Sequence, residues 1–196
     1  MKKFIAIAAL LTTLAGCSAS EAAAATITVE TVSTATTSKV EQGLWNPFGN
    51  VQPMTLLAKE AFARQVLVNN AIRVNTVTTK LHKTVGKTWY VFSGWSPRYG
   101  WDCSGLVMWY YKQLGITLHH SAFTEKYAAK PHKYSEAKAK VGDIIAFPGH
   151  VGIYVGNGYM IHAPHPGVRT QKTKVWAWAK ENGTSNVTYT RLIKTA

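Results

Sequence analysis

The order of the segments constrains the fold of this chain more than any other feature of its sequence. Residues 103–114 are predicted to form a helix, because Leu106 and Tyr110 mark one apolar face and Gly115 follows where a C-terminal cap belongs. The strand-like segments come later, at residues 143–147, 151–155, 159–163 and 187–193. Helices first and antiparallel strands afterwards indicate an α+β domain, which we assign to residues 76–196.

The chain before this domain is predicted to contain a linker and a helical extension. Residues 18–40 are Ala, Thr and Ser with little else, a composition that cannot bury a core and indicates a flexible linker. Residues 41–75 are expected to be a helical N-terminal extension, with a helix over residues 56–72 that Thr55 can cap. A further helical stretch over residues 74–85 is less regular, because Thr and Val are frequent there.

Residues 1–17 have the composition of a signal peptide. Two lysines precede an apolar run, residues 4–14, that is too short to span a bilayer as a stable helix. The sequence Leu-Ala-Gly-Cys at residues 14–17 fits a lipobox, and Cys17 would then carry a lipid anchor. The alternative is an ordinary secretory peptide cut near residues 22–25. In both cases we expect an extracytoplasmic protein, either anchored to the membrane as a lipoprotein or freely secreted.

Cys103 is the only cysteine outside this leader, so it has no disulfide partner in an oxidising compartment. It lies at the predicted start of a helix, where free N–H groups and the helix dipole stabilise a thiolate. Gly105 in the first turn allows another segment to approach closely. The alternative is a buried structural cysteine, but the polar neighbours Asp102 and Ser104 argue against a sealed core. We therefore interpret Cys103 as a nucleophile.

A cysteine nucleophile needs a base, and the base needs a group that orients it. His150 at a strand start is the candidate base, and His162 on the next strand is the candidate orienting residue. The two strands are joined by Gly-Asn-Gly at residues 156–158, a strong signal for a hairpin turn. The two histidines are therefore predicted to lie on neighbouring antiparallel strands.

The loop length decides whether the two histidines can meet. If the loop has three residues, Val155 pairs with Tyr159 and Gly152 faces His162. His150 and His162 then share one face of the hairpin as diagonal neighbours, with ~7–8 Å between their backbones. A two-residue loop would place them on opposite faces. The proposed chemistry therefore predicts a loop of odd length.

The remaining histidines do not form a metal motif. No His-Glu-x-x-His is present, and the spacing of His162 and His165 is not that of zinc peptidase ligands. His119 and His120 are sequence neighbours and diverge in an extended chain. We therefore expect no metal and no cofactor. The histidines expected to be structural or surface residues are His82, His132 and His165.

The net charge of +13 indicates an anionic partner. Export makes nucleic acid the weaker candidate, the sequence contains no nucleic-acid-binding motif, and the lysines are spread along the chain. The carboxylates and phosphates of a cell wall fit an exported basic protein better, and a simply solvated basic surface is the alternative.

Six blocks of sequence carry a resemblance to a known family. They are residues 89–94 (Trp-Tyr-Val-Phe-Ser-Gly), 102–107 (Asp-Cys-Ser-Gly-Leu-Val), 114–118, 142–147, 150–158 and 160–163. In this order they resemble the NlpC-type cell-wall endopeptidases, which are papain-like cysteine peptidases of bacteria and phages. The resemblance implies a papain-like α+β fold, with N-terminal helices and a nucleophile helix packed on a small antiparallel sheet.

The resemblance also implies roles for single residues. Cys103 matches the nucleophile, His150 the general base and His162 the polar third member of a catalytic triad. The residues implied to position or bind substrate are Tyr90, Asp102, Ser104 and Ser121. The departures from the family pattern are Ser93, His119-His120 and Val141. The His-His pair corresponds to a position near the cleft, so it bears on substrate preference rather than on the reaction.

The implied activity is hydrolysis of peptidoglycan stem peptides, at the bond between D-γ-glutamyl and the diamino acid. The partners would be stem peptides and the anionic cell wall, with membrane contact only through a lipid anchor at Cys17, and we expect a monomer. Three alternatives stay open: a CHAP-like N-acetylmuramoyl-L-alanine amidase, a non-catalytic cell-wall-binding module, and a transacylase that uses the same acyl-enzyme.

Overall fold

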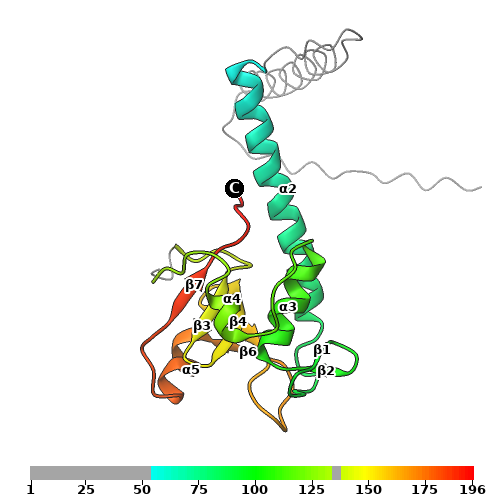
Figure 1. The fold of residues 1–196 in the computed structure, drawn as a ribbon, viewed down its shortest axis with the longest axis vertical. Coiled ribbons are helices and arrows are strands. Elements are labelled where there is room, and N and C mark those ends of the chain that lie inside the picture. The colour runs from blue at the N-terminus through cyan, green and yellow to red at the C-terminus, as the bar shows by residue number, and fades with distance from the viewer. Residues whose placement is uncertain (1–53, 134–137) are drawn as a thin grey trace, which may run out of the picture. The chain divides into compact units, whose positions relative to one another are not determined.

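The computed structural model describes residues 54–133 and 138–196 (Figure 1). The predicted signal peptide, the linker and the first part of the predicted extension lie outside these ranges. The part that is described combines helices with an antiparallel sheet, which confirms the predicted α+β class. Within it, no helix has both the length and the apolar composition needed to cross a membrane.

Helix α2 (Leu56–His82) joins the two predicted helical stretches into one element. The Thr55 hydroxyl accepts a backbone N–H of the first turn at 3.3 Å, as expected of a cap. Val74, Val77 and Leu81 are buried along the second half of the helix. Their packing on the core keeps this Thr- and Val-rich segment helical despite its weak propensity.

Residues 63–196 form one compact unit, and the chain up to Phe62 belongs to another. Of that other unit the structure describes residues 54–62, in which the side chains of Leu56 and Leu57 are exposed. The sheet, the remaining helices and the candidate site all lie within residues 63–196.

Helix α3 (Cys103–Gln113) confirms the helix predicted over residues 103–114. It begins at Cys103 because the Asp102 carboxylate caps it, accepting the N–H of Gly105 at 2.7 Å. Gly115 follows the helix with φ +82°, a conformation that glycine adopts without strain. The apolar face of α3 is buried against the sheet, and Tyr110 has no exposed surface.

Five antiparallel strands form the central sheet in the order β6-β5-β4-β3-β7 (Figure 1). Their bounds are β3 Ile144–Phe147, β4 His150–Gly156, β5 Tyr159–His162, β6 Gln171–Lys174 and β7 Thr188–Thr190. Alternate residues of β3 enter separate hydrophobic clusters: Ile144 packs with α2 and α3, whereas Ile145 packs with α5 (Val175–Glu181). Helices therefore cover both faces of the sheet.

The four predicted strands correspond to β3, β4, β5 and β7, and several shorter elements were not predicted. These are β1 (Trp95–Ser96), β2 (Gly100–Trp101), α4 (Ala122–Lys126), β6 and α5. β1 and β2 form a small separate sheet just before α3. Two of the missed elements, β6 and α5, turn out to border the candidate site.

The hairpin between β4 and β5 does not have the predicted three-residue loop. Tyr159 pairs with Gly156 rather than with Val155, so the loop consists of Asn157 and Gly158. Both loop residues have positive φ, 54° and 75°, which is the geometry of a tight two-residue turn. The prediction was wrong here because the extra residue lies in the strand, where the register shifts at Val155 as a β-bulge.

The bulge nevertheless preserves the predicted register of the hairpin. On its far side Tyr154 pairs with Met160, a register that places Gly152 opposite His162. A Cβ at Gly152 would lie 3.0 Å from the His162 Cβ, so glycine provides the room that the histidine occupies. His150 and His162 therefore face the same side of the hairpin, as the odd-length argument required.

Candidate active site

Cys103 is half-buried at the first position of α3. Its sulfur accepts the backbone N–H groups of Ser104 and of Val151, the residue that directly follows His150 on β4. Burial raises the pKa of Cys103 to about 11, with a further contribution from the Asp102 charge, although the two N–H groups act in the opposite direction. The resting group at neutral pH is therefore the thiol, and a base would be needed to form the reactive thiolate.

His150 and His162 contact each other from neighbouring strands. Nε2 of His150 lies 2.8 Å from Nδ1 of His162, and Nε2 of His162 lies 3.2 Å from Oγ1 of Thr173 on β6. The two imidazoles are 7% and 0% exposed. Burial lowers the pKa of His150 to about 4, and burial together with the nearby His150 lowers the pKa of His162 to about 3. Both rings are therefore neutral at pH 7 and able to act as proton acceptors.

Asp102 is saturated with hydrogen bonds from the protein itself. Its Oδ1 accepts from the Gly105 N–H, the Ser104 hydroxyl at 3.0 Å and Nε2 of His120 at 2.8 Å, and its Oδ2 accepts from the Ser93 N–H at 2.9 Å. Burial acts to raise the pKa of Asp102, but these hydrogen bonds and the His120 charge hold it below its ordinary value. The carboxylate therefore fixes the start of α3, while its predicted contact with substrate stays a prediction.

The other predicted binding residues lie at two places. Tyr90 forms a β-bridge with Trp101, two residues before Cys103, and burial followed by the nearby Cys103 and Asp102 raises the pKa of its phenol. Ser104 hydrogen-bonds to Asp102 in the first turn of α3. Ser121 caps α4, with its hydroxyl accepting the Thr124 N–H at 3.5 Å. A role for these residues in binding substrate stays a prediction.

Three further side chains contact the predicted site residues. His120, which the resemblance linked to substrate preference, hydrogen-bonds to Asp102. Thr173 completes the hydrogen-bond chain behind His162. Trp178 on α5 stacks on His150, with ring centroids 4.5 Å apart and planes inclined by 22°. No spacing in the sequence points to Thr173 or Trp178, because both reach the histidines only through the fold of β6 and α5.

No three His, Cys, Asp or Glu side chains come together as metal ligands within residues 54–133 and 138–196. The histidines expected to be structural or surface residues are all exposed: His82, His132 and His165. The neutral imidazoles of His150 and His162 are hydrogen-bonded to each other rather than directed at a shared metal position. The site therefore contains a thiol and a pair of imidazoles, which are the kinds of group that nucleophilic catalysis uses.

The NlpC/P60 family model matches residues 86–185, just over half of the chain. The chain belongs to the NlpC/P60 family. This membership confirms the resemblance drawn from the six sequence blocks. The matched region contains the candidate nucleophile, both histidines and the aromatic residue that covers them.

Two relatives with named activities are similar to this NlpC/P60 chain. The bifunctional muramidase/DL-endopeptidase CwlT of Bacillus subtilis is 40% identical over 97 residues, which are 45% of this chain and 29% of CwlT. The murein DD-endopeptidase MepH of Escherichia coli is 35% identical over 123 residues, which are 59% of this chain and 44% of MepH. The chain thus matches less than half the length of either relative.

A solved NlpC/P60 domain has the same fold. The crystal structure of the NlpC/p60 domain of the peptidoglycan hydrolase SagA matches with a TM-score of 0.51 and 29% sequence identity. The match covers 60% of this chain and 98% of that domain. This similarity confirms the predicted papain-like α+β fold, in which a helix packs on an antiparallel sheet.

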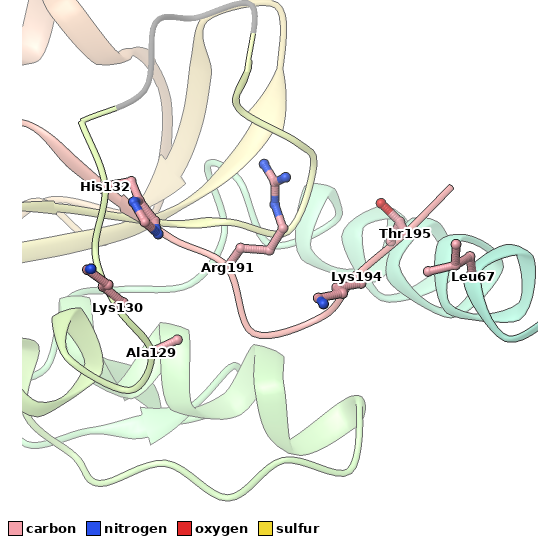
Figure 2. Close-up of a pocket in the computed structure, with 7 residues that line it drawn as sticks. All are labelled: Leu67, Ala129, Lys130, His132, Arg191, Lys194 and Thr195. Carbon is pink, nitrogen blue, oxygen red and sulfur yellow. The ribbon is translucent and has the colours of Figure 1, made fainter. Parts of the chain in front are cut away.

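This NlpC/P60 domain also has a cavity of about 480 Å³ that none of the candidate catalytic residues lines (Figure 2). Its basic residues come from the segment after α4 and from the chain after β7: Lys130, His132, Arg191 and Lys194. Arg191 also forms an ion pair with the buried Asp143 at 2.7 Å. The cavity is thus a basic feature of the surface, separate from the thiol and the imidazoles.

Proposed function

We propose that the chain is a cysteine endopeptidase that hydrolyses peptidoglycan stem peptides, with Cys103, His150 and His162 as its catalytic residues. The observation that carries this proposal is the hydrogen-bonded pair of buried imidazoles, together with the Cys103 sulfur that accepts the N–H of Val151, the residue directly after His150. The names of the relatives support it, since CwlT and MepH are endopeptidases and SagA is a peptidoglycan hydrolase.

One assignment of the imidazole hydrogen bonds leaves a nitrogen of His150 free to take the proton. If the His150 Nε2–H donates to Nδ1 of His162, then the His162 Nε2–H donates to Oγ1 of Thr173. Nδ1 of His150 then carries the free lone pair and acts as the base for the Cys103 thiol. His162 keeps His150 in this tautomer and orientation, which is the role of the third member of a triad.

The first step breaks the peptide bond. The sulfur of Cys103 attacks the stem-peptide carbonyl as its proton moves to His150, and a C–S bond forms. The negative charge that develops on the carbonyl oxygen can be stabilised by backbone N–H groups at the start of α3. His150 then gives the proton to the leaving amine, the C–N bond breaks, and a thioester remains.

The second step returns the site to its resting state. A water molecule attacks the thioester while His150 takes one of its protons. The C–S bond breaks, the stem-peptide fragment leaves as a carboxylic acid, and His150 returns the proton to the Cys103 sulfur. Burial favours neutral thiol and neutral imidazole before and after each cycle, so the charges exist only during the reaction.

The bond that we propose for cleavage lies between D-γ-glutamyl and the diamino acid. The named activities of the relatives differ in this respect, since CwlT is a DL-endopeptidase and MepH a DD-endopeptidase. The position of the cut is therefore the part of the proposal that product analysis has to decide.

We also propose that the protein binds anionic wall polymers. The described part of residues 63–196 contains 18 Lys and Arg residues and four carboxylate residues. Three of the four carboxylates are buried and one is exposed: Asp102, Glu125, Asp143 and, at the surface, Glu181. The outer surface of this unit is thus almost purely basic, which favours a polyanionic wall. Activity at the cell wall fits a monomer that is secreted or anchored to the membrane through Cys17.

Digestion of purified peptidoglycan tests the proposal. The protein and its Cys103→Ala variant are incubated with peptidoglycan, and the soluble products are identified by mass spectrometry. We expect fragments that end in a γ-linked glutamyl residue, and none from the variant. Release of whole stem peptides would instead identify an amidase, and transfer to an added amine a transacylase. Binding to the wall without any product would leave a non-catalytic module.

A further inference from the structure

Trp178 is the residue of α5 whose ring lies against both histidines. Its indole stacks on His150 with centroids 4.5 Å apart at 22°, and it meets His162 edge-on at 5.6 Å and 84°. It also contacts Phe147, with ring centroids 4.5 Å apart and planes inclined by 51°. The aromatic contact between Trp178 and His150 is nearly parallel, so the two rings share a broad face.

The hydrogen bond to His162 does not by itself fix the plane of the His150 ring. It constrains one atom, Nε2, whereas the torsion that turns an imidazole about its Cβ–Cγ bond is soft. A flat surface against the ring face restricts this rotation. Phe147 does not supply it, because its ring centroid lies 6.2 Å from that of His150 at an inclination of 37°. Trp178 is therefore the surface that sets the ring plane.

The same contact affects the charge that His150 gains during the reaction. His150 is 7% exposed, and burial lowers its pKa to about 4, so an imidazolium has little water to stabilise it. The face of an indole carries the negative part of its quadrupole and attracts a cation placed above it. Trp178 thus excludes water from the ring, and since the pKa of His150 is lowered overall, this exclusion outweighs the attraction of the indole face for the protonated ring.

We propose that Trp178 is a positioning residue for His150, whose indole holds the imidazole in the plane that keeps Nε2 on His162 and excludes water from the ring. The inference rests on the proposed function, because it takes His150 as the base. It adds Trp178 to the three proposed catalytic residues, and Trp178 lies on α5 rather than on α3 or on the β4–β5 hairpin.

Few charged groups from the neighbouring elements face His150. β5 contributes His162, α3 begins with the Cys103 thiol, and β3 (Ile144–Phe147) contains no titratable residue. The charged residues of α5 and of its N-cap point to solvent: Lys174, Lys180 and Glu181. Loss of the indole therefore changes the access of water to His150 rather than the charges around it.

Three variants test the proposal by steady-state hydrolysis of purified muropeptides across a range of pH. Trp178→Leu keeps an apolar side chain but removes the ring, and we expect kcat to fall roughly 10- to 100-fold with KM changed less than about threefold. The acid limb of the kcat profile should move to higher pH, toward the ordinary histidine value of 6.5, because water reaches the imidazole. Trp178→Phe should restore most of kcat. Trp176→Ala, 48% exposed on the same helix, is the matched control and should leave kcat unchanged.

Several outcomes would overturn the assignment. These are an equal fall of kcat in Trp178→Leu and Trp178→Phe, a change in KM alone, or an acid limb of the kcat profile that does not move. If Trp178→Leu does not fold, Trp178→Tyr joins Trp178→Phe, and both must keep kcat within about threefold because both keep a ring face. NMR titration of the His150 imidazole gives a readout that needs no hydrolysis. If the unaltered protein cleaves nothing, the proposed function fails, while the titration still decides whether Trp178 controls the pKa of His150.

Discussion

Glu125 on α4 is a buried carboxyl that the proposed reaction does not use. Its side chain has no exposed surface, and neither carboxyl oxygen has a hydrogen-bond partner among the described residues. Burial, followed by the negative charge of Asp102, raises the pKa of Glu125 to about 10, so the group is protonated at neutral pH. An unfolded glutamate ionises near 4.5. Between these two values the native state binds more protons than the unfolded state, and stability therefore falls as the pH rises.

Replacing this carboxyl by an amide should remove that pH dependence. Glu125→Gln has nearly the same shape, so we expect its free energy of unfolding to match that of the unaltered protein at pH 4. At pH 7 it should be higher by about 3 kcal/mol, because the unfolded state no longer gains from ionisation. Denaturant unfolding at a series of pH values measures the difference. Glu181→Gln, at an exposed position of α5, should show little such gain. Parallel pH profiles for Glu125→Gln and the unaltered protein would contradict this account.

At the scale of single elements, the bulge at Val155 brings the two histidines to the same side of the hairpin. The two-residue turn at Asn157 and Gly158 would alone put His150 and His162 on opposite faces, and the extra residue in β4 restores the register. Asn-Gly is a strong signal for a two-residue turn, but a bulge has no comparable signature in this strand. The sequence could therefore predict the register that the chemistry needs but not the way in which the chain achieves it.

Deleting Val155 tests the importance of this bulge. We expect hydrolysis to fall by more than about 100-fold, because β4 up to the deletion changes face relative to β5 and separates the base from His162. The unfolding temperature should fall as well, since buried strand residues move with it. Adding one glycine to the loop of the deletion variant restores the number of residues between the two paired strands. This addition should recover part of the hydrolysis and part of the unfolding temperature. Full activity in the simple deletion would show that the register does not matter.

The predictions succeeded where periodicity is strong and failed where an element is short. The helix from Cys103 and the strand around Val151 have clear apolar patterns and a cap or a turn at their ends. β6 is a polar edge strand of four residues, and α5 has seven residues and no side-chain cap at Lys174. Trp178 could not be assigned to the site because its contact with His150 exists only once α5 has packed against the sheet.

At the scale of the whole molecule, the basic surface should control retention on an anionic wall. We expect sedimentation with peptidoglycan that carries anionic polymers to weaken as the salt concentration rises, because salt screens exposed charges. Lys130→Gln with Lys194→Gln removes two charges at the cavity of Figure 2 and should weaken retention severalfold. Lys83→Gln with Lys87→Gln removes the same net charge elsewhere and is the matched control. Equal effects of the two pairs would assign retention to net charge rather than to the cavity.

The burial that raises the pKa of Cys103 to about 11 also protects the sulfur chemically. Peroxides and disulfides react with thiolates far faster than with thiols. A sulfur that stays protonated until a carbonyl is bound is therefore a poor target for conversion to sulfenic acid or to a mixed disulfide. For the proposed exported enzyme, the nucleophile therefore stays reduced in an oxidising environment until His150 takes its proton.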